Sequence, residues 1–169
     1  MTDDVAARRL VLVPLTLDDA GEMVAVLAGD ELYAFTGGRP PTFPELHARY
    51  ARQLVGHSSD GGQEWLNWII RLVRDQTAIG YVQATVVDDG QRAEIAWVVG
   101  RPWHGQGYAK EAAAALMGWL DARDVRIVQA RIHPAHAASA AVARHAGLLP
   151  TGQFQDGEQL WRKGATPQT

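Results

Sequence analysis

The stretch from Glu94 to Leu120 limits the possible folds of this chain more than any other. It reads EIAWVVGRPWHGQGYAKEAAAALMGWL. The residues that follow Glu94, as far as Val99, are mostly apolar and β-branched, which is typical of a buried strand. Two glycines, Gly105 and Gly107, then precede a long alanine-rich run that indicates a helix. Because the first turn of a helix has free N–H groups and the positive end of the helix dipole, this order predicts a binding site for a phosphorylated ligand.

Size and composition indicate one ordinary globular domain. The chain has 169 residues, of which 47% are hydrophobic and 21% are charged, so a single domain over residues 1–169 is expected. The polar ends, 1–8 and 164–169, are expected to be flexible. There is no cysteine, which excludes disulfides and thiolate chemistry.

Charge and hydropathy narrow the class of partner. The formal net charge of −3 gives no basic footprint for nucleic acid. No apolar run approaches the ~18 residues of a membrane-spanning helix, and the N-terminus does not resemble a signal peptide. We therefore expect a cytoplasmic protein that binds neither nucleic acid nor membrane.

Periodicity predicts the order strand, two helices, three strands, helix, strand, helix and two strands. The strands are expected at 9–15, 65–73, 77–87, 92–99, 125–132, 148–154 and 158–162, and the helices at 20–27, 44–55, 105–123 and 135–146. Strand 94–99, the helix after it and strand 125–132 form a βαβ unit, so these two strands should be parallel. The fold class is therefore α/β (α+β): a mixed, mostly antiparallel seven-stranded sheet with about four helices on its two faces.

The residues of this turn resemble the GNAT superfamily of acyl-CoA N-acyltransferases. The family signature is Gln/Arg-x-x-Gly-x-Gly/Ala, and in the window HGQGYA both Gly107 and Ala109 match it, whereas His104 stands where Gln or Arg is usual. The longer segment PWHGQGYAKEA resembles the W-x-G-x-G-Y-A-x-E-A pattern of the branch that contains ribosomal-protein alanine and serine N-acetyltransferases.

A second motif lies about thirty residues further on. The family has Asn-x-x-Ser and then a helix that ends in Gly-Phe; here Ser139 and Gly147 match, His136 replaces the Asn and Leu148 replaces the Phe. The element order also agrees with the family, so the resemblance covers nearly the whole chain. A Rossmann site is disfavoured because its third glycine would fall at Lys110.

The resemblance implies acetyl-CoA as co-substrate. In the family the sheet splits beside the strand that corresponds to 94–99, and the pantetheine arm threads the gap. The backbone of Trp97 and Val99 would hold that arm, and an N–H near Val98 would polarise the thioester carbonyl. Arg144 either reaches the 3′-phosphate side of coenzyme A or is a solvated helix residue. Cofactor contacts are thus expected from Trp97, Val98, Val99, His104, Gly105, Gln106, Gly107, Tyr108, Ala109, Lys110, His136, Ser139 and Arg144.

Two residues are candidates for catalysis by the same resemblance. Glu94 could accept the ammonium proton of the acceptor through water; alternatively it is a structural partner of Arg92 or Arg71, or simply a solvated strand residue. Ser139 could donate a proton to the leaving thiolate, contact the cofactor or make only a local backbone bond. The histidines near His136 lack a carboxylate at ligand spacing, so no metal site is expected.

The implied reaction is transfer of an acetyl group from acetyl-CoA to a primary amine by direct attack in a ternary complex. The acceptor is a small molecule or the N-terminal amine of a peptide or protein, and specificity should lie around the loop from Gly37 to Pro44. Asp30, Glu31, Asp60 and Glu64 could form an acidic mouth. A homodimer is possible, and a non-catalytic acyl-CoA-binding or sensor module is the alternative function.

Overall fold

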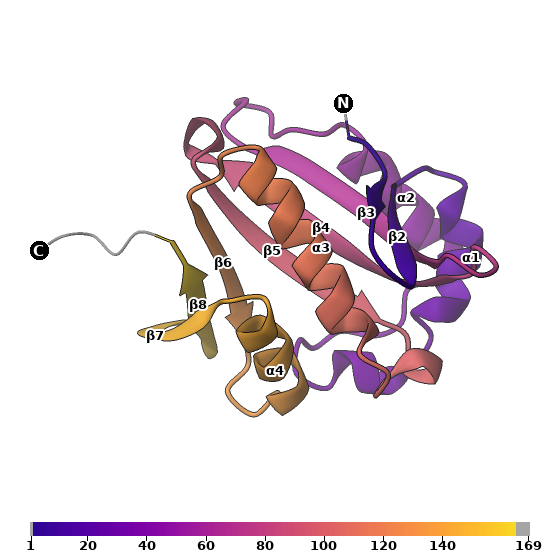
Figure 1. Cartoon of the computed structure of the whole chain (residues 1–169). Coiled ribbons are helices and arrows are strands. Elements are labelled where there is room, and N and C mark those ends of the chain that lie inside the picture. Colours follow the sequence, from indigo (N-terminus) through magenta and orange to yellow (C-terminus); the bar gives the residue numbers. More distant parts are fainter. Residues whose placement is uncertain (1, 165–169) are drawn as a thin grey trace, which may run out of the picture.

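The structure, a computed structural model, describes residues 2–164 (Figure 1). One sheet carries all eight strands in the order β1-β2-β3-β4-β5-β6-β8-β7. The strands are β1 (Val5–Ala6), β2 (Leu10–Pro14), β3 (Glu64–Leu72), β4 (Ala78–Val87), β5 (Arg92–Val99), β6 (Ile127–Ile132), β7 (Leu149–Gln155) and β8 (Glu158–Lys163). The neighbours β5 and β6 are parallel and the other pairs are antiparallel, so the mixed sheet and its βαβ unit are as predicted.

The predicted strand number of seven is wrong, because β1 adds an eighth strand. Val5 and Ala6 pair with Leu12 and Val11 at the edge of the sheet. Two residues are too few to show a period, and they are held by pairing with β2 rather than by their own sequence. The expected flexibility of residues 1–8 stays a prediction, and residues 165–169 lie outside the described part of the chain.

The described residues form four α-helices, as expected: α1 (Asp19–Val26), α2 (Phe43–Gln53), α3 (Tyr108–Ala122) and α4 (Ala137–His145). The helix α3 begins three residues later than predicted, because Gly105 and Gly107 have left-handed φ angles of 74° and 81°. Gly147 is the predicted C-terminal glycine of α4, with φ 88°, and the N–H of Leu148 donates to the carbonyl of Ala143, which is the Schellman arrangement.

The helices form two layers on either side of the sheet. Figure 1 shows α3 lying across one face, with α4 beside β6, while α1 and α2 lie behind the half of the sheet that contains β3 and β4. The α3 face buries one core, which includes Trp68, Ile95 and Leu116. The other face buries a smaller core around Met23 and Leu46. No helix within residues 2–164 is long and apolar enough to cross a membrane.

Candidate active site

The sheet opens between β5 and β6. The two strands pair at only three positions, of which Glu94 with Gln129 is the last, although β5 continues to Val99 and β6 to Ile132. Figure 1 shows the two strands diverging, with α4 below the gap. Backbone groups of β5 beyond Glu94 therefore have no β6 partner.

The alternation of the strand decides which backbone groups face the gap. The N–H of Gly100 donates to Ile79 on the preceding hairpin strand β4, while the carbonyl of Gln91 accepts from Ile127 at the start of β6. Because successive residues point to opposite edges of a strand, the backbone groups of Trp97 and Val99 face the gap. The N–H of Val98 points toward β4 by the same rule, so the N–H groups that face the gap on either side of it are those of Trp97 and Val99.

The glycine turn leads into helix α3, whose N-terminus has no side-chain cap. Gly107 is the N-cap of α3 in the left-handed region and supplies no side-chain hydrogen bond. The first backbone bond within α3 runs from Glu111 N–H to the Gly107 carbonyl. The N–H groups of Tyr108, Ala109 and Lys110 consequently remain available at the positive end of the helix dipole.

A cavity of about 440 Å³ lies between this turn, the free end of β5 and helix α4. Its lining includes eleven of the predicted cofactor-binding residues: Trp97, Val98, Val99, His104, Gly105, Gly107, Tyr108, Ala109, Lys110, His136 and Ser139. We call it the cofactor cavity. Two segments far apart in the sequence thus meet around one space.

Gln106, Arg144 and Glu94 do not line the cofactor cavity. The carbonyl of Gln106 accepts a hydrogen bond of 2.9 Å from Arg9 Nη1, so this residue contributes to holding the turn. Arg144 lies over the ring of Trp161, 5.0 Å from its centroid. The expected contact of Arg144 with the 3′-phosphate side of coenzyme A therefore stays a prediction.

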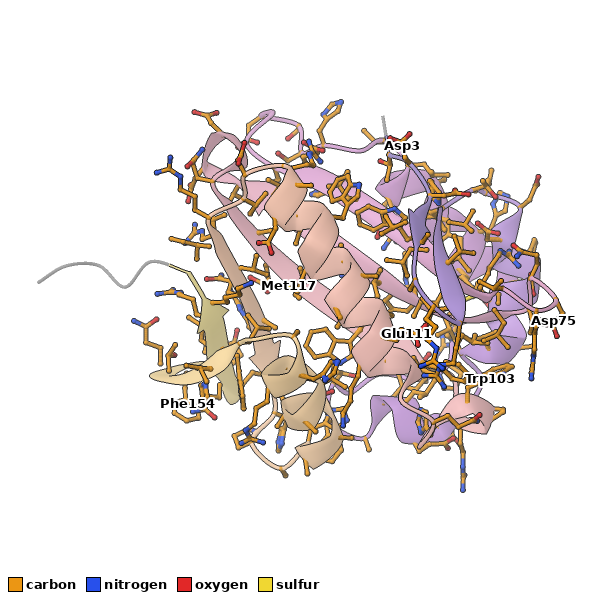
Figure 2. All side chains as sticks on the ribbon, in the orientation of Figure 1. Asp3, Asp75, Trp103, Glu111, Met117 and Phe154 are labelled. Carbon is orange, nitrogen blue, oxygen red and sulfur yellow. The ribbon has the colours of Figure 1, made fainter. Side chains whose placement is uncertain are left out.

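Arg9 and Glu111 stabilise the glycine turn through hydrogen bonds. Neither residue was predicted from the sequence to belong to the site. The backbone N–H and Nε of Arg9 donate to the two carboxylate oxygens of Glu111 at 2.8 and 2.9 Å. The guanidinium also lies 4.4 Å from the ring centroid of Tyr108. Figure 2 shows Glu111 on the side of α3 that faces β2. Glu111 was visible in the motif PWHGQGYAKEA, but no local signal marks Arg9.

His104 has a defined structural partner. Its Nε2 lies 2.6 Å from the carbonyl oxygen of Val99, and because a carbonyl can only accept, Nε2 must carry the proton. The imidazole thus closes the space between the end of β5 and the start of the turn. The replacement of the usual Gln or Arg leaves the turn intact and removes a long polar side chain from it.

His136 and Ser139 lie at the start of α4, where β6 has ended. Ser139 Oγ is 3.4 Å from His136 Nε2, and the ring of Phe35 stacks on His136 with centroids 4.5 Å apart. Burial, followed by the charges of His133 and His104, lowers the pKa of His136. His136 is therefore favoured as a neutral imidazole, which can exchange a hydrogen bond with Ser139.

Glu94 lies where β5 and β6 separate, on the sheet face opposite α3. Its carboxylate is 3.4 Å from Arg131 Nε, and the two side chains are 40% and 34% exposed. Gln129 Nε2 donates to its other oxygen at 3.4 Å. Neither Arg92 nor Arg71, the structural partners suggested by the sequence, pairs with it; both pair with other carboxylates. Glu94 is thus held at the opening and remains accessible to solvent.

Metal ligation has no support in the described residues. No group of three or more His, Asp or Glu side chains within residues 2–164 is placed to hold a metal ion. His133 Nδ1 already accepts a hydrogen bond from the N–H of Ala135.

Comparison with known proteins bears on the whole domain. The family model described as "Acetyltransferase (GNAT) domain" matches residues 9–149. None of the curated proteins compared with the chain matches it in sequence.

Among solved structures, the chain resembles RimL, a ribosomal alpha-N-protein acetyltransferase in complex with coenzyme A, with a TM-score of 0.79 and 15% identity, covering 95% of this chain and 97% of that one. The microcin C7 self immunity acetyltransferase MccE, in complex with acetyl-CoA and AMP, has a TM-score of 0.76 and 13% identity over 93% of each chain. A chimera of the spermidine N-acetyltransferase SpeG from Vibrio cholerae and hSSAT has a TM-score of 0.72 and 14% identity, over 92% of this chain and 93% of the other. At these identities the likeness concerns the fold.

Proposed function

The chain belongs to the GNAT acetyltransferase domain family, and on that premise we propose that it transfers an acetyl group from acetyl-CoA to a primary amine by direct attack in a ternary complex. The observation that carries this proposal is the cofactor cavity, in which the glycine turn and the His136–Ser139 motif line one space beside the open edge of β5. Structural neighbours with coenzyme A or acetyl-CoA bound support the co-substrate.

The cavity would hold acetyl-CoA mainly through backbone groups. The free N–H groups of Tyr108, Ala109 and Lys110 suit the pyrophosphate, and the helix dipole and the Lys110 ammonium add favourable charge. The pantetheine arm would pair with the open edge of β5 at Trp97 and Val99. An N–H on this edge would then polarise the thioester carbonyl as charge develops on its oxygen.

The chemistry requires a neutral amine and a stabilised leaving group. Glu94 would accept the ammonium proton, through water, while Gln129 and Arg131 hold its carboxylate in place. The amine nitrogen then attacks the thioester carbon, the C–S bond breaks as the amide forms, and the proton that the nitrogen loses would pass, through water, to the departing thiolate. The Ser139 hydroxyl, oriented by His136, would donate a hydrogen bond to the departing thiolate.

Two measurements test the proposal with the full chain. Titration calorimetry with acetyl-CoA is expected to give saturable binding, and thiol release in the presence of a broad amine panel is expected to identify an acceptor. Absence of acetyl-CoA binding contradicts the assignment of the cavity. Binding without turnover on any amine would instead favour the non-catalytic sensor.

A further inference from the structure

A second hollow lies on the opposite face of the sheet, under α2. Two cavities of about 240 and 280 Å³ meet there. Both are lined by Arg49 and Gln53 of α2 and by Asn67 and Gln83 of β3 and β4. We treat them as one depression and call it the α2 groove. None of its residues belongs to the motifs that form the cofactor cavity.

The inner end of the α2 groove approaches the cofactor cavity. Tyr81 lines the groove, and it is the cross-strand partner of Val98, which lines the cofactor cavity. Because directly paired residues share a sheet face, the Tyr81 and Val98 side chains adjoin, and both pack in the core beneath α1 and α2. An amine held at this end of the groove would thus lie next to the part of β5 that borders the gap.

The charge of the α2 groove is positive. Its charged lining residues are Arg49 and Arg52, and the lining contains no carboxylate. Neither guanidinium forms an ion pair within residues 2–164, although most other arginines there do. A guanidinium that faces a hollow without a counterion is suited to a carboxylate from outside the chain.

The interior of the groove offers further donors. Tyr50 lines it and is 4% exposed, and its hydroxyl has no hydrogen-bond partner among the described residues. Burial raises the pKa of the Tyr50 and Tyr81 hydroxyls, and the charge of Arg49 opposes this rise at both. The hydroxyls therefore stay protonated and can donate, with the Arg49 charge close by.

The carboxylates considered for an acidic mouth do not line the α2 groove, although Glu31 lines the cofactor cavity. Glu31 pairs with Arg101, Glu64 pairs with Arg123, and Asp60 accepts hydrogen bonds within its own loop. These carboxylates occupy separate places and line neither half of the α2 groove.

We propose that the α2 groove binds the acceptor and that Arg49 pairs with a carboxylate on it, so that the substrate is an amine that also carries negative charge. Two sources have this chemistry: a free amino acid, and the N-terminus of a peptide with an acidic residue close behind it. A polyamine or an aminoglycoside would place like charges against Arg49 and Arg52. The assignment of the groove to the acceptor rests on the proposed acetyl transfer.

The test measures binding to the full chain saturated with coenzyme A, so that it does not depend on turnover. Calorimetric titrations compare L-leucine with leucinamide, a Ser-Glu-Glu peptide amide with a Ser-Lys-Lys peptide amide, and both pairs with spermidine. In at least one pair the acidic probe is expected to bind roughly 3- to 5-fold more tightly, as an ion pair with an exposed guanidinium allows. The pair that discriminates identifies the source of the carboxylate.

Variants assign the effect to one residue. Arg49→Gln is expected to abolish the preference, and Arg49→Lys to restore part of it, because a lysine keeps the charge but not the planar fork. Arg74→Gln is the matched control: Arg74 is exposed in the β3–β4 turn, pairs with Asp75 and lines neither half of the groove. Thermal unfolding checks that each variant is folded.

Three results overturn the proposal: no binding of either acidic probe, equal binding within both pairs, or a preference that survives Arg49→Gln. A preference that depends on Arg49, together with no thiol release from acetyl-CoA on the broad amine panel, supports an anionic ligand and contradicts the proposed acetyl transfer. The proposed acceptor site and the proposed acetyl transfer can therefore be contradicted independently.

Discussion

The cofactor cavity and the α2 groove are built in different ways. The cavity is lined mainly by two continuous stretches, around the glycine turn and the start of α4, and the backbone N–H groups of the first turn of α3 lie at it without a side-chain cap. The groove collects single side chains from α2, β3 and β4. A backbone site depends on local conformation, which a short motif specifies, whereas a side-chain site depends on how distant elements pack. The cofactor cavity could therefore be predicted from the sequence, whereas the α2 groove could not.

This difference predicts which measured quantity a substitution in each region changes. Changes in the turn should weaken coenzyme A binding, and changes at the sheet opening should slow the reaction without affecting that binding. The variants below, in order of decreasing expected effect, test this separation.

Gly107→Val should damage the cofactor side most. Gly107 has φ 81°, a conformation that a β-branched residue adopts only under strain, and a valine side chain would obstruct the approach of phosphate. Coenzyme A affinity measured by calorimetry should fall on the order of 100-fold.

The matched control is Gly118→Ala within α3, where an added Cβ meets nothing within 4 Å. That variant should keep its affinity and gain roughly 0.5–1 kcal/mol of stability from helix propensity. Unchanged affinity in folded Gly107→Val would overturn the phosphate assignment of the turn.

Glu94→Gln tests the sheet opening, where a substitution should slow the reaction without weakening coenzyme A binding. Loss of the base should lower turnover at neutral pH by about 100-fold, while coenzyme A affinity stays the same because Glu94 does not line the cofactor cavity. Steady-state kinetics and calorimetry measure the two quantities. Glu64→Gln, at an exposed carboxylate that pairs with Arg123, is the control. A variant that works at full speed removes Glu94 as the base.

Ser139→Ala tests a residue that lines the cofactor cavity and is proposed to donate a hydrogen bond to the departing thiolate. Loss of a hydrogen bond to a thiolate should slow turnover about 10-fold and change coenzyme A affinity much less. Ser59→Ala, in an exposed loop, should have no effect. If Ser139→Ala keeps its turnover, the serine is a packing or capping residue only.

His136→Asn tests the smallest effect, the pH dependence of stability. Because the pKa of His136 is lowered in the folded state, the unfolded chain takes up its proton first as pH falls from about 6.5, and stability drops through that window. The loss of Tm between about pH 7.5 and about pH 5.5 should therefore be smaller in His136→Asn. His145→Asn, exposed on the same helix, is the control for the loss of an imidazole, and an equal loss of Tm in all three proteins contradicts the assignment.

Much of the fold could be predicted because its signals are periodic and local. The βαβ unit, the Asp88–Gly90 hairpin turn and the Schellman glycine Gly147 follow from residue patterns within a few positions. The strand β1 could not be predicted, since its two residues gain their conformation only by pairing with β2. Arg9 was missed for a related reason: its partner Glu111 lies 102 residues away in sequence.

The sequence alone determined the family, the element order and the turn at which a phosphate group should bind, because glycine conformation and helix ends act within a few residues. The tertiary structure decided which side chains face each other. It placed Arg131 beside Glu94 and left Arg144 outside the lining of the cofactor cavity. It also placed Arg49 in the lining of the α2 groove, which contains no carboxylate. Such contacts join elements that are separated in the chain, so packing fixes them and no local pattern records them.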